Sequence, residues 1–331
     1  MSYAQALMFL LMVLIAVSHA GQAEDTILNS KTWWFGNSFP GGKGKDARWM
    51  IHYLEAFVVR GERIYCLTHW DERGGEAAIY TTDGDFFHAP DGWHSWGFRG
   101  GTAVAADDKY IYYSMGHDPK DGGGLDYAGV ARYTLDGKPA PWAGATHNFR
   151  LAICDDHTKK PTGLAVAEGE LFVSDPSQGR IAVFATSTMK LTRELPFKNP
   201  GQLTIDAGPE RALWIIDTAA KAVVKIDRNG KDLGVRITDC RDPTAICIDK
   251  KTGDLLVADN ALDRKQIRCY RADSGEHIKG KDFGEPIYTG ANPGAVVPGR
   301  FYNIHAIDTD ADGNLYVGGG WECGAKLHKF D

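Results

Sequence analysis

The sequence predicts an all-β fold: a six-bladed β-propeller of four-stranded antiparallel blades. The first observation is a repeat, because an apolar strand pattern that ends in Asp recurs every 42 residues, at 171–175, 213–217 and 255–259. The second is that each copy follows a Pro and a short β-prone run and precedes another such run. The third is that no segment shows the 3.6-residue apolar period of an amphipathic helix. Such units bury their faces by stacking radially into a ring.

Six copies of this unit can be traced along the chain. The copy at 161–184 is the clearest, with Gly and Asp between its runs, as tight hairpin turns require. A fourth well-formed copy covers 303–330, and two degenerate copies are centred on 64–66 and 111–113. We therefore expect one propeller domain over 31–331, with blades near 50–90, 100–150, 160–199, 200–242, 243–290 and 300–331.

The last unit stops after its third strand. We expect the missing outer strand to come from residues 31–39, which would close the ring as a latch. The alternative is that the chain is a piece of a longer protein.

Residues 161–184 resemble the NHL repeat, with PTGLAV, GELFVSD and GRIAVF in its three strands. The resemblance extends over roughly 160–330 and is weak before 150. It implies a six-bladed propeller from a group that contains binding scaffolds, gluconolactonase-like hydrolases and a peptidyl-hydroxyglycine lyase. Because one fold carries several functions in this group, the resemblance does not select among them.

The N-terminal segment has the pattern of a signal peptide. Residues 1–23 contain no charged side chain, and 7–17 form an unbroken apolar run followed by small residues. That run is shorter than the ~20 residues that span a bilayer. We therefore expect a signal peptide at 1–23 and an exported protein, periplasmic, extracellular or at the cell surface. An uncleaved anchor is the alternative, and we expect the body to be soluble.

Charge and cysteine content exclude some classes of function. The formal net charge of −6 argues against nucleic acid as the main partner. The 6 Cys include no C-x-x-C pair, so neither a zinc ribbon nor a haem attachment site is indicated. Export would allow the cysteines to pair, whereas their apolar surroundings equally suit buried free thiols.

The repeat also predicts where a ligand would bind. In a propeller blade, the start of the innermost strand and the end of the second strand lie at the same end of the channel. The starts supply Thr162, Gln202, Thr244 and His305, and the ends supply Asp175, Asp217 and Asp259. These aspartates would either hold their own turns, the interpretation that we favour, or form a carboxylate ring for a cation or basic ligand.

Tryptophan is concentrated in the N-terminal half, where 7 of the 9 residues lie between 33 and 142. Several adjoin histidines, as His69 and Trp70 do. Such pairs either stack on a sugar or aromatic ligand, or pack between blades, which is the interpretation that we favour.

The enzymes of the group provide a test of catalysis. His305 stands where the lyase's metal-binding histidines are expected, but the equivalent positions hold Thr162, Gln202 and Thr244. A catalytic zinc needs about three protein ligands, so zinc chemistry is disfavoured. The gluconolactonase-like metal ligands would be Glu55 and Asp217 or Asp259, with no matching asparagine.

The segment Asp308, Asp310 and Asp312 begins like a calcium-binding loop. An EF-hand has Glu at its twelfth position, and that position is Gly319. We favour an ordinary hairpin turn, with calcium as the alternative.

Together these observations predict an exported propeller that binds a small molecule, glycan or protein at its channel face. The expected ligand-binding residues are His305, Asp175, Asp217, Asp259, Thr162, Thr244, His69 and Trp70. The alternative is a metal-dependent hydrolase or lyase with calcium or zinc.

Overall fold

The computed structural model describes residues 31–34, 53–69, 75–84, 86–91, 98–121, 124–145, 149–287, 299–319 and 326–330. The predicted signal peptide at 1–23 lies outside these residues. In the described part, regular structure is β apart from one 3-10 turn, Pro119–Asp121. No helix there is long and apolar enough to cross a membrane.

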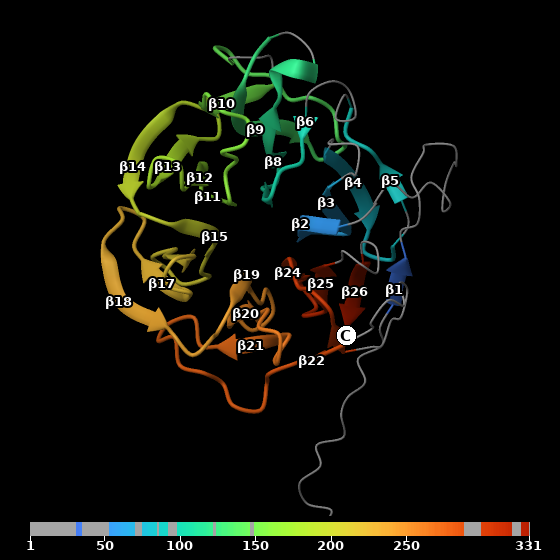
Figure 1. Ribbon diagram of the computed structural model, residues 1–331, viewed down its shortest axis with the longest axis vertical. Helices are drawn as coiled ribbons and strands as arrows, with labels where there is room; N and C mark the ends of the chain where they lie inside the picture. The colour runs from blue at the N-terminus through green and yellow to red at the C-terminus, as the bar shows by residue number, and fades with distance from the viewer. Residues whose placement is uncertain are drawn as a thin grey trace, which may run out of the picture.

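Six small antiparallel sheets are arranged in a ring, as predicted (Figure 1). The first blade consists of β2(Tyr53–Arg60), β3(Arg63–His69), β4(Gly75–Thr81) and β5(Phe86–His88). The second consists of β7(Val104–Ala106), β8(Tyr110–His117), β9(Tyr127–Thr134) and β10(Arg150–Cys154). The third consists of β11(Gly163–Ala167), β12(Glu170–Asp175), β13(Arg180–Ala185) and β14(Leu191–Pro196). A short strand, β6(Phe98–Arg99), also pairs with β8.

The other three blades complete the ring. The fourth consists of β15(Pro200–Ile205), β16(Leu213–Asp217), β17(Ala222–Ile226) and β18(Asp232–Ile237). The fifth consists of β19(Pro243–Ile248), β20(Leu255–Asp259) and β21(Gln266–Tyr270). The sixth consists of β24(Ala306–Thr309), β25(Leu315–Gly319), β26(Lys326–Phe330) and β1(Lys31–Trp34). In the fifth blade, single bridges from Phe283 to Ile267 and from His277 to Tyr270 stand in place of a fourth strand. Two short strands, β22(Glu285–Pro286) and β23(Arg300–Phe301), pair in parallel.

The N-terminal latch is present. Strand β1 pairs antiparallel with β26, in the register Lys31 to Lys329 and Trp34 to Lys326. The final blade therefore combines both ends of the described chain, which is the closure that the sequence predicted from 31–39. Among those residues the structure describes 31–34.

The innermost strands contact one another in the order β2, β7, β11, β15, β19 and β24, and β24 contacts β2. Apolar side chains fill the wedges between adjacent blades. Between the fourth and fifth blades, Trp214 is fully buried with Val223, Leu255 and Tyr270. Because successive side chains of a strand point to opposite faces of its sheet, each blade packs apolar side chains against the blade on either side.

Five cysteines in the described part are unpaired, namely Cys66, Cys154, Cys240, Cys247 and Cys269. All but Cys154 are buried. Cys247 and Cys269 belong to one apolar cluster between the fifth and sixth blades. These thiols therefore act as small apolar side chains, and burial raises the pKa of Cys269 to about 11.

Candidate ligand site at the channel mouth

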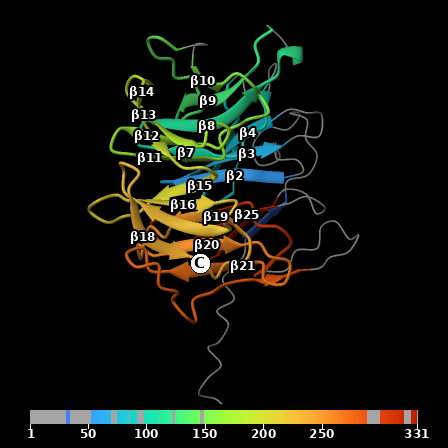
Figure 2. The same ribbon diagram turned by 60° about the vertical axis from the view of Figure 1, so that its left-hand side comes forward.

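Strand register places the predicted ligand-binding residues that the structure describes at one end of the channel. In the third blade, Gly163 at the start of β11 pairs with Ser174 near the end of β12. The residues before each innermost strand therefore lie beside the end of the second strand. Strands β3 and β8, each the second of its blade, run to the same side of the ring (Figure 2). We call this end of the channel the mouth.

One polar side chain per blade lies at the start of each innermost strand. All six are half-buried, so each is held by the protein and still accessible. We call this set the mouth ring: Glu55, Thr102, Thr162, Gln202, Thr244 and His305.

The threonines of the mouth ring connect neighbouring blades. The Thr102 hydroxyl donates to the Pro161 carbonyl at 2.8 Å, and the Thr162 hydroxyl donates to the Pro200 carbonyl at 2.7 Å. The Thr244 hydroxyl likewise donates to the carbonyl of Ile304 at 2.8 Å. Because each hydroxyl proton is used, the oxygen lone pairs remain as hydrogen-bond acceptors.

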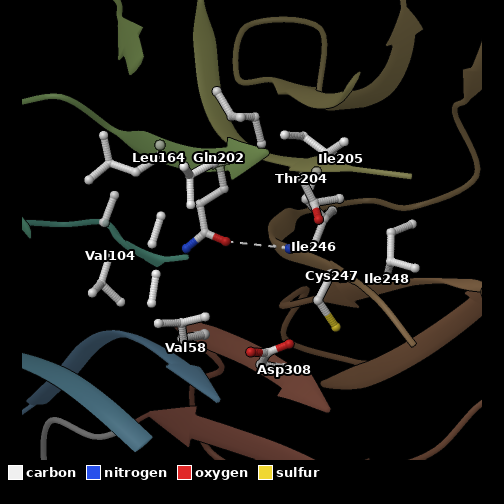
Figure 3. Close-up of a pocket in the computed structure, with 18 of the residues that line it drawn as sticks. Val58, Val104, Leu164, Gln202, Thr204, Ile205, Ile246, Cys247, Ile248 and Asp308 are labelled. Carbon is white, nitrogen blue, oxygen red and sulfur yellow. Dashed lines mark hydrogen bonds between the residues drawn. The ribbon is translucent and has the colours of Figure 1, made fainter. Parts of the chain in front are cut away.

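Gln202 reaches further across the channel than the threonines. Its Nε2 donates to the His305 carbonyl at 3.2 Å, and its Oε1 accepts from the Ile246 amide at 3.4 Å. Figure 3 shows this side chain projecting toward the middle of the cavity from β15. Gln202 thus bridges the fourth blade to both the fifth and the sixth.

The charged members of the mouth ring face each other. The Nδ1 of His305 lies 3.7 Å from the Oε2 of Glu55, and the two side chains are 29% and 22% exposed. They belong to adjacent blades, β24 and β2, although 250 positions separate them in sequence. This contact places the two ionisable side chains of the mouth ring beside each other.

Below the mouth ring, the channel contains a cavity of about 400 Å³. Its walls are mainly aliphatic. The Ser174 hydroxyl is buried behind Gly163, which lines the cavity. Among the described residues this hydroxyl has no hydrogen-bond partner. Buried polar groups are normally paired, and this one lies behind Gly163 rather than among the side chains that line the cavity.

The three predicted aspartates hold turns. Asp217 accepts hydrogen bonds from the backbone amides of Ala219 and Ala220 at 3.1 and 3.0 Å. Asp175 and Asp259 are almost fully buried and accept from amides and side chains of the adjacent loops. Burial alone would raise the pKa of Asp259, but these amide donors lower it. The geometry is that of the turn-holding role, because protein donors occupy the carboxylates.

Asp308, Asp310 and Asp312 lie at the opposite end of the channel. Asp308 accepts from the backbone amide of Val59 at 2.7 Å and pairs with Lys250. Asp310 accepts from the Tyr316 hydroxyl at 3.0 Å and from amides of its own turn. These contacts stabilise a hairpin turn and connect neighbouring blades, as expected for the hairpin turn that we favour from the sequence.

The remaining predicted residues are placed less fully. His69 is the last residue of β3, so its backbone lies at the mouth end of the first blade. Trp70 lies outside the described residues. Of the tryptophans predicted to pack between blades, Trp142 packs against the clusters on both sides of the second blade.

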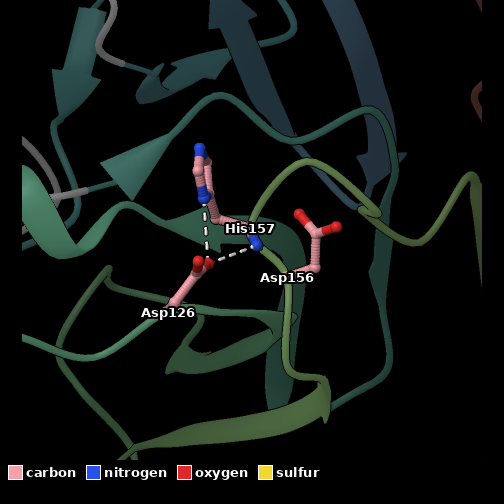
Figure 4. A group of neighbouring side chains, drawn as sticks. All are labelled: Asp126, Asp156 and His157. Atoms are coloured by element: carbon pink, nitrogen blue, oxygen red, sulfur yellow. Dashed lines mark hydrogen bonds and ion pairs between the residues drawn. The ribbon is translucent and has the colours of Figure 1, made fainter.

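A separate acidic cluster lies on the mouth face between the second and third blades (Figure 4). The Nδ1 and backbone amide of His157 contact Asp126 Oδ1 at 2.9 and 2.7 Å. The Nε2 of His157 lies 3.6 Å from Asp118, and Asp156 binds the hydroxyl of Thr158 at 2.6 Å. The His157 hydrogen bonds lower the pKa of Asp126. These contacts tie the loop between β8 and β9 to the segment that leads into β11.

Sequence reasoning missed Thr102 as a site residue. The repeat is degenerate before residue 150, and Gly101 rather than Pro precedes this threonine. A usable signal was present, because Thr102 is followed by the small and apolar residues Ala103 and Val104, just as Thr162 is followed by Gly163 and Leu164.

No family model and no curated protein matches this chain. Its fold is similar to a streptogramin B lyase structure, with 12% identity, a TM-score of 0.53, and 91% of this chain and 98% of that chain covered. Virginiamycin B lyase from Staphylococcus aureus gives 14% identity, the same TM-score and the same coverage. The WD40 β-propeller domain of Doa1 gives 11% identity, a TM-score of 0.50, and coverage of 85% and 94%. The shared property is the propeller fold.

Proposed function

We propose that this chain is an exported binding scaffold that holds a small, neutral, polar molecule at the mouth ring. The observation that carries the proposal is the convergence of six half-buried polar side chains, one from each blade, above a cavity. Small-molecule sites combine a concave, mostly apolar wall with a few convergent polar groups.

Charge and hydrogen-bonding capacity support a neutral ligand. Four of the six members of the mouth ring carry no ionisable group, and the other two, Glu55 and His305, lie 3.7 Å apart. The threonine oxygens and the Gln202 carboxamide supply acceptors and one donor group. A molecule with several hydroxyl or amide groups matches this pattern better than an ion does.

The N-terminal segment and the repeat motif support the export and the binding role in this proposal. Residues 1–23, which contain no Lys, Arg, Asp or Glu and include the apolar run at 7–17, support passage through a secretory route. The motif at 161–184 supports blades of the NHL type, with an arrangement in which ligands bind at one face of the ring.

Capture of metabolites tests the binding proposal. The purified chain is incubated with a filtered small-molecule extract, washed, and analysed by mass spectrometry after denaturation. We expect enrichment of one neutral polar class by the native chain and its loss in Thr162→Val/Thr244→Val. The matched control is Thr158→Val/Thr252→Val, which alters two exposed turn threonines. Equal enrichment by all three proteins would reject the mouth ring as the site.

A second candidate function is catalysis at the Glu55–His305 pair. A carboxylate beside one imidazole nitrogen orients the ring and leaves the other nitrogen able to take a proton from a substrate. Two of the proteins with a similar fold are lyases, so a propeller of this kind can support catalysis. At 12% and 14% identity, however, the similarity is evidence for the fold and not for a shared reaction.

The mouth ring does not suit a catalytic zinc, which needs about three protein ligands. It offers one imidazole and one carboxylate, and its other members are Thr and Gln. Calcium takes oxygen ligands, which Glu55, the Gln202 carbonyl oxygen and the threonine hydroxyls would supply.

Metal analysis and turnover together test this candidate. We would measure calcium and zinc content of the purified chain, and then its activity on lactone and ester panels. If His305 acts as a general base, we expect the His305→Gln variant to fold normally and to lose turnover. Absence of turnover by the native chain with and without added calcium would reject the enzyme candidate.

A further inference from the structure

The cavity below the mouth ring differs chemically from the mouth itself. Its volume of about 400 Å³ lies within the ~300–1,000 Å³ range of small-molecule pockets. Its walls carry side chains from most of the inner strands, chiefly Val58, Leu164, Val166, Ile205, Ile246 and Ile248. Several of these are half-buried rather than buried, so the cavity exposes aliphatic surface.

Charged groups line only the far end of this cavity. They come from the last residues of the inner strands or from the loops that follow: Arg60, Arg211, Asp249, Lys250 and Asp308. Lys250 pairs with Asp308 there. The middle of the channel is therefore lined mainly by aliphatic side chains, with Thr204 among them, and lies between two polar ends. We call this part of the channel the sleeve.

Gln202 lies across the top of the sleeve. Of the mouth ring, Gln202 alone lines the cavity. Its hydrogen bonds to the His305 carbonyl and the Ile246 amide, at 3.2 and 3.4 Å, lie at or beyond the ordinary limit of about 3.2 Å. Rotation of this side chain would therefore give up only these two long hydrogen bonds.

We propose that the cavity holds an alkyl or acyl chain that extends from the polar part of the ligand bound at the mouth, and that Gln202 is the gate through which this chain passes. This inference rests on the proposed binding of the polar part at the mouth ring. The ligand class is then an amphiphile with a neutral, hydrogen-bonding head and one narrow apolar tail. Burial of each methylene in the sleeve supplies affinity that the polar mouth alone lacks.

Straight-chain alcohols test the cavity without requiring a head group. Butanol, pentanol and hexanol are titrated into the full chain with 13C-labelled Ile, Leu and Val methyl groups. We expect saturable shifts at Val58, Ile205 and Ile248, with affinity rising about fourfold per added methylene. Unchanged shifts at these methyls, or affinities independent of chain length, would overturn the proposal.

The gate is tested by exchange rates in the same spectra. Gln202→Ala is expected to raise the rate of hexanol association several-fold, and Gln178→Ala, an exposed glutamine on the same face, should leave it unchanged. Equal rates in the native chain and Gln202→Ala would reject the gate. A cavity-filling variant, Val166→Phe, should abolish hexanol binding if its methyl spectrum remains folded.

The experiments distinguish failure of the polar site at the mouth ring from failure of the tail site in the cavity. If alcohols bind the sleeve but metabolite capture is insensitive to the mouth-ring threonines, the cavity stands and the polar mouth site falls. If capture depends on the threonines but alcohols leave the sleeve methyls unshifted, the mouth site stands and the tail site falls.

Discussion

The carboxylate of Asp308 accepts a 2.7 Å hydrogen bond from the backbone amide of Val59, a residue 249 positions earlier in the chain. This contact joins β24 to β2, the last inner strand to the first. Asp308 is buried and also pairs with Lys250 of the fifth blade. One side chain therefore connects three blades at the seam where the ring closes.

Removal of this carboxylate should weaken the closed ring. Asp308→Ala leaves the buried Val59 amide without its acceptor, and an unmet buried donor costs about 1–3 kcal/mol. We expect the free energy of unfolding to fall by that amount in urea titrations followed by circular dichroism. Asp312→Ala, at an exposed position of the next turn, is the control and should change the free energy by less than about 0.5 kcal/mol. A stability loss shared by both variants would contradict this role.

The latch strand offers a second test of closure. Deletion of residues 1–34 removes β1 and exposes the edge of β26. Loss of several ladder hydrogen bonds should lower the free energy of unfolding by about 2–4 kcal/mol, and the open edge should promote self-association. Urea titration and light scattering measure both effects. A chain that begins at residue 24 is the control, and identical behaviour of the two deletions would refute the latch.

The third and fourth blades are joined by a carboxylate with a shifted pKa. Hydrogen bonding by Arg193 lowers the pKa of Glu170 to about 2 from an ordinary 4.5; burial opposes this, and Arg228 adds to it. Because the folded pKa is depressed, the stabilisation is complete above about pH 4.5 and is lost as the pH falls toward 2.

Glu170→Gln should therefore lower the free energy of unfolding by about 1–2 kcal/mol at pH 7. The difference from the native chain should shrink below pH 4.5 and vanish near pH 2. Urea titrations between pH 2 and 7 measure this. Glu194→Gln, whose carboxylate is 48% exposed beside Arg180, should show little effect. A pH-independent difference for Glu170→Gln would argue against the ion pair as its cause.

The turn-holding aspartates should affect folding and spare binding. Asp259 is fully buried and accepts from the amides of Arg241 and Asp242 at 3.1 and 2.9 Å. Asp259→Ala should lower the free energy of unfolding by about 1–3 kcal/mol. Asp217→Ala, with two exposed turn contacts, should cost less. If a folded Asp217→Ala chain lost metabolite capture, the carboxylates would belong to the ligand site.

Local patterns predicted the ring and much of the mouth. The 42-residue period and the Pro at the start of three inner strands located Thr162, Gln202 and Thr244, and the well-formed fourth copy of the repeat located His305. Thr102 escaped because its copy of the repeat is degenerate and also lacks the Pro. The Asp308–Val59 contact escaped because a partner 249 positions away leaves no local trace.

The register around Glu55 also limited the prediction. A bulge between Leu54 and Ala56 shifts the start of β2, and a bulge turns a side chain away from the alternation of its strand. The pairing of Glu55 with His305 therefore required the folded ring. In the fifth blade, bridges at His277 and Phe283 replace the regular outer strand that the period implied.

The threonine methyl groups of the mouth ring test the central claim most directly. With 13C-labelled Thr methyls, the chain is titrated with the neutral polar class recovered by metabolite capture, or with a panel of sugars and sugar lactones. The mouth-ring site predicts that the methyls of Thr102, Thr162 and Thr244 shift together in one saturable transition, which His305→Ala weakens. Saturable binding that shifts other threonine methyls and leaves these three unmoved would contradict the site.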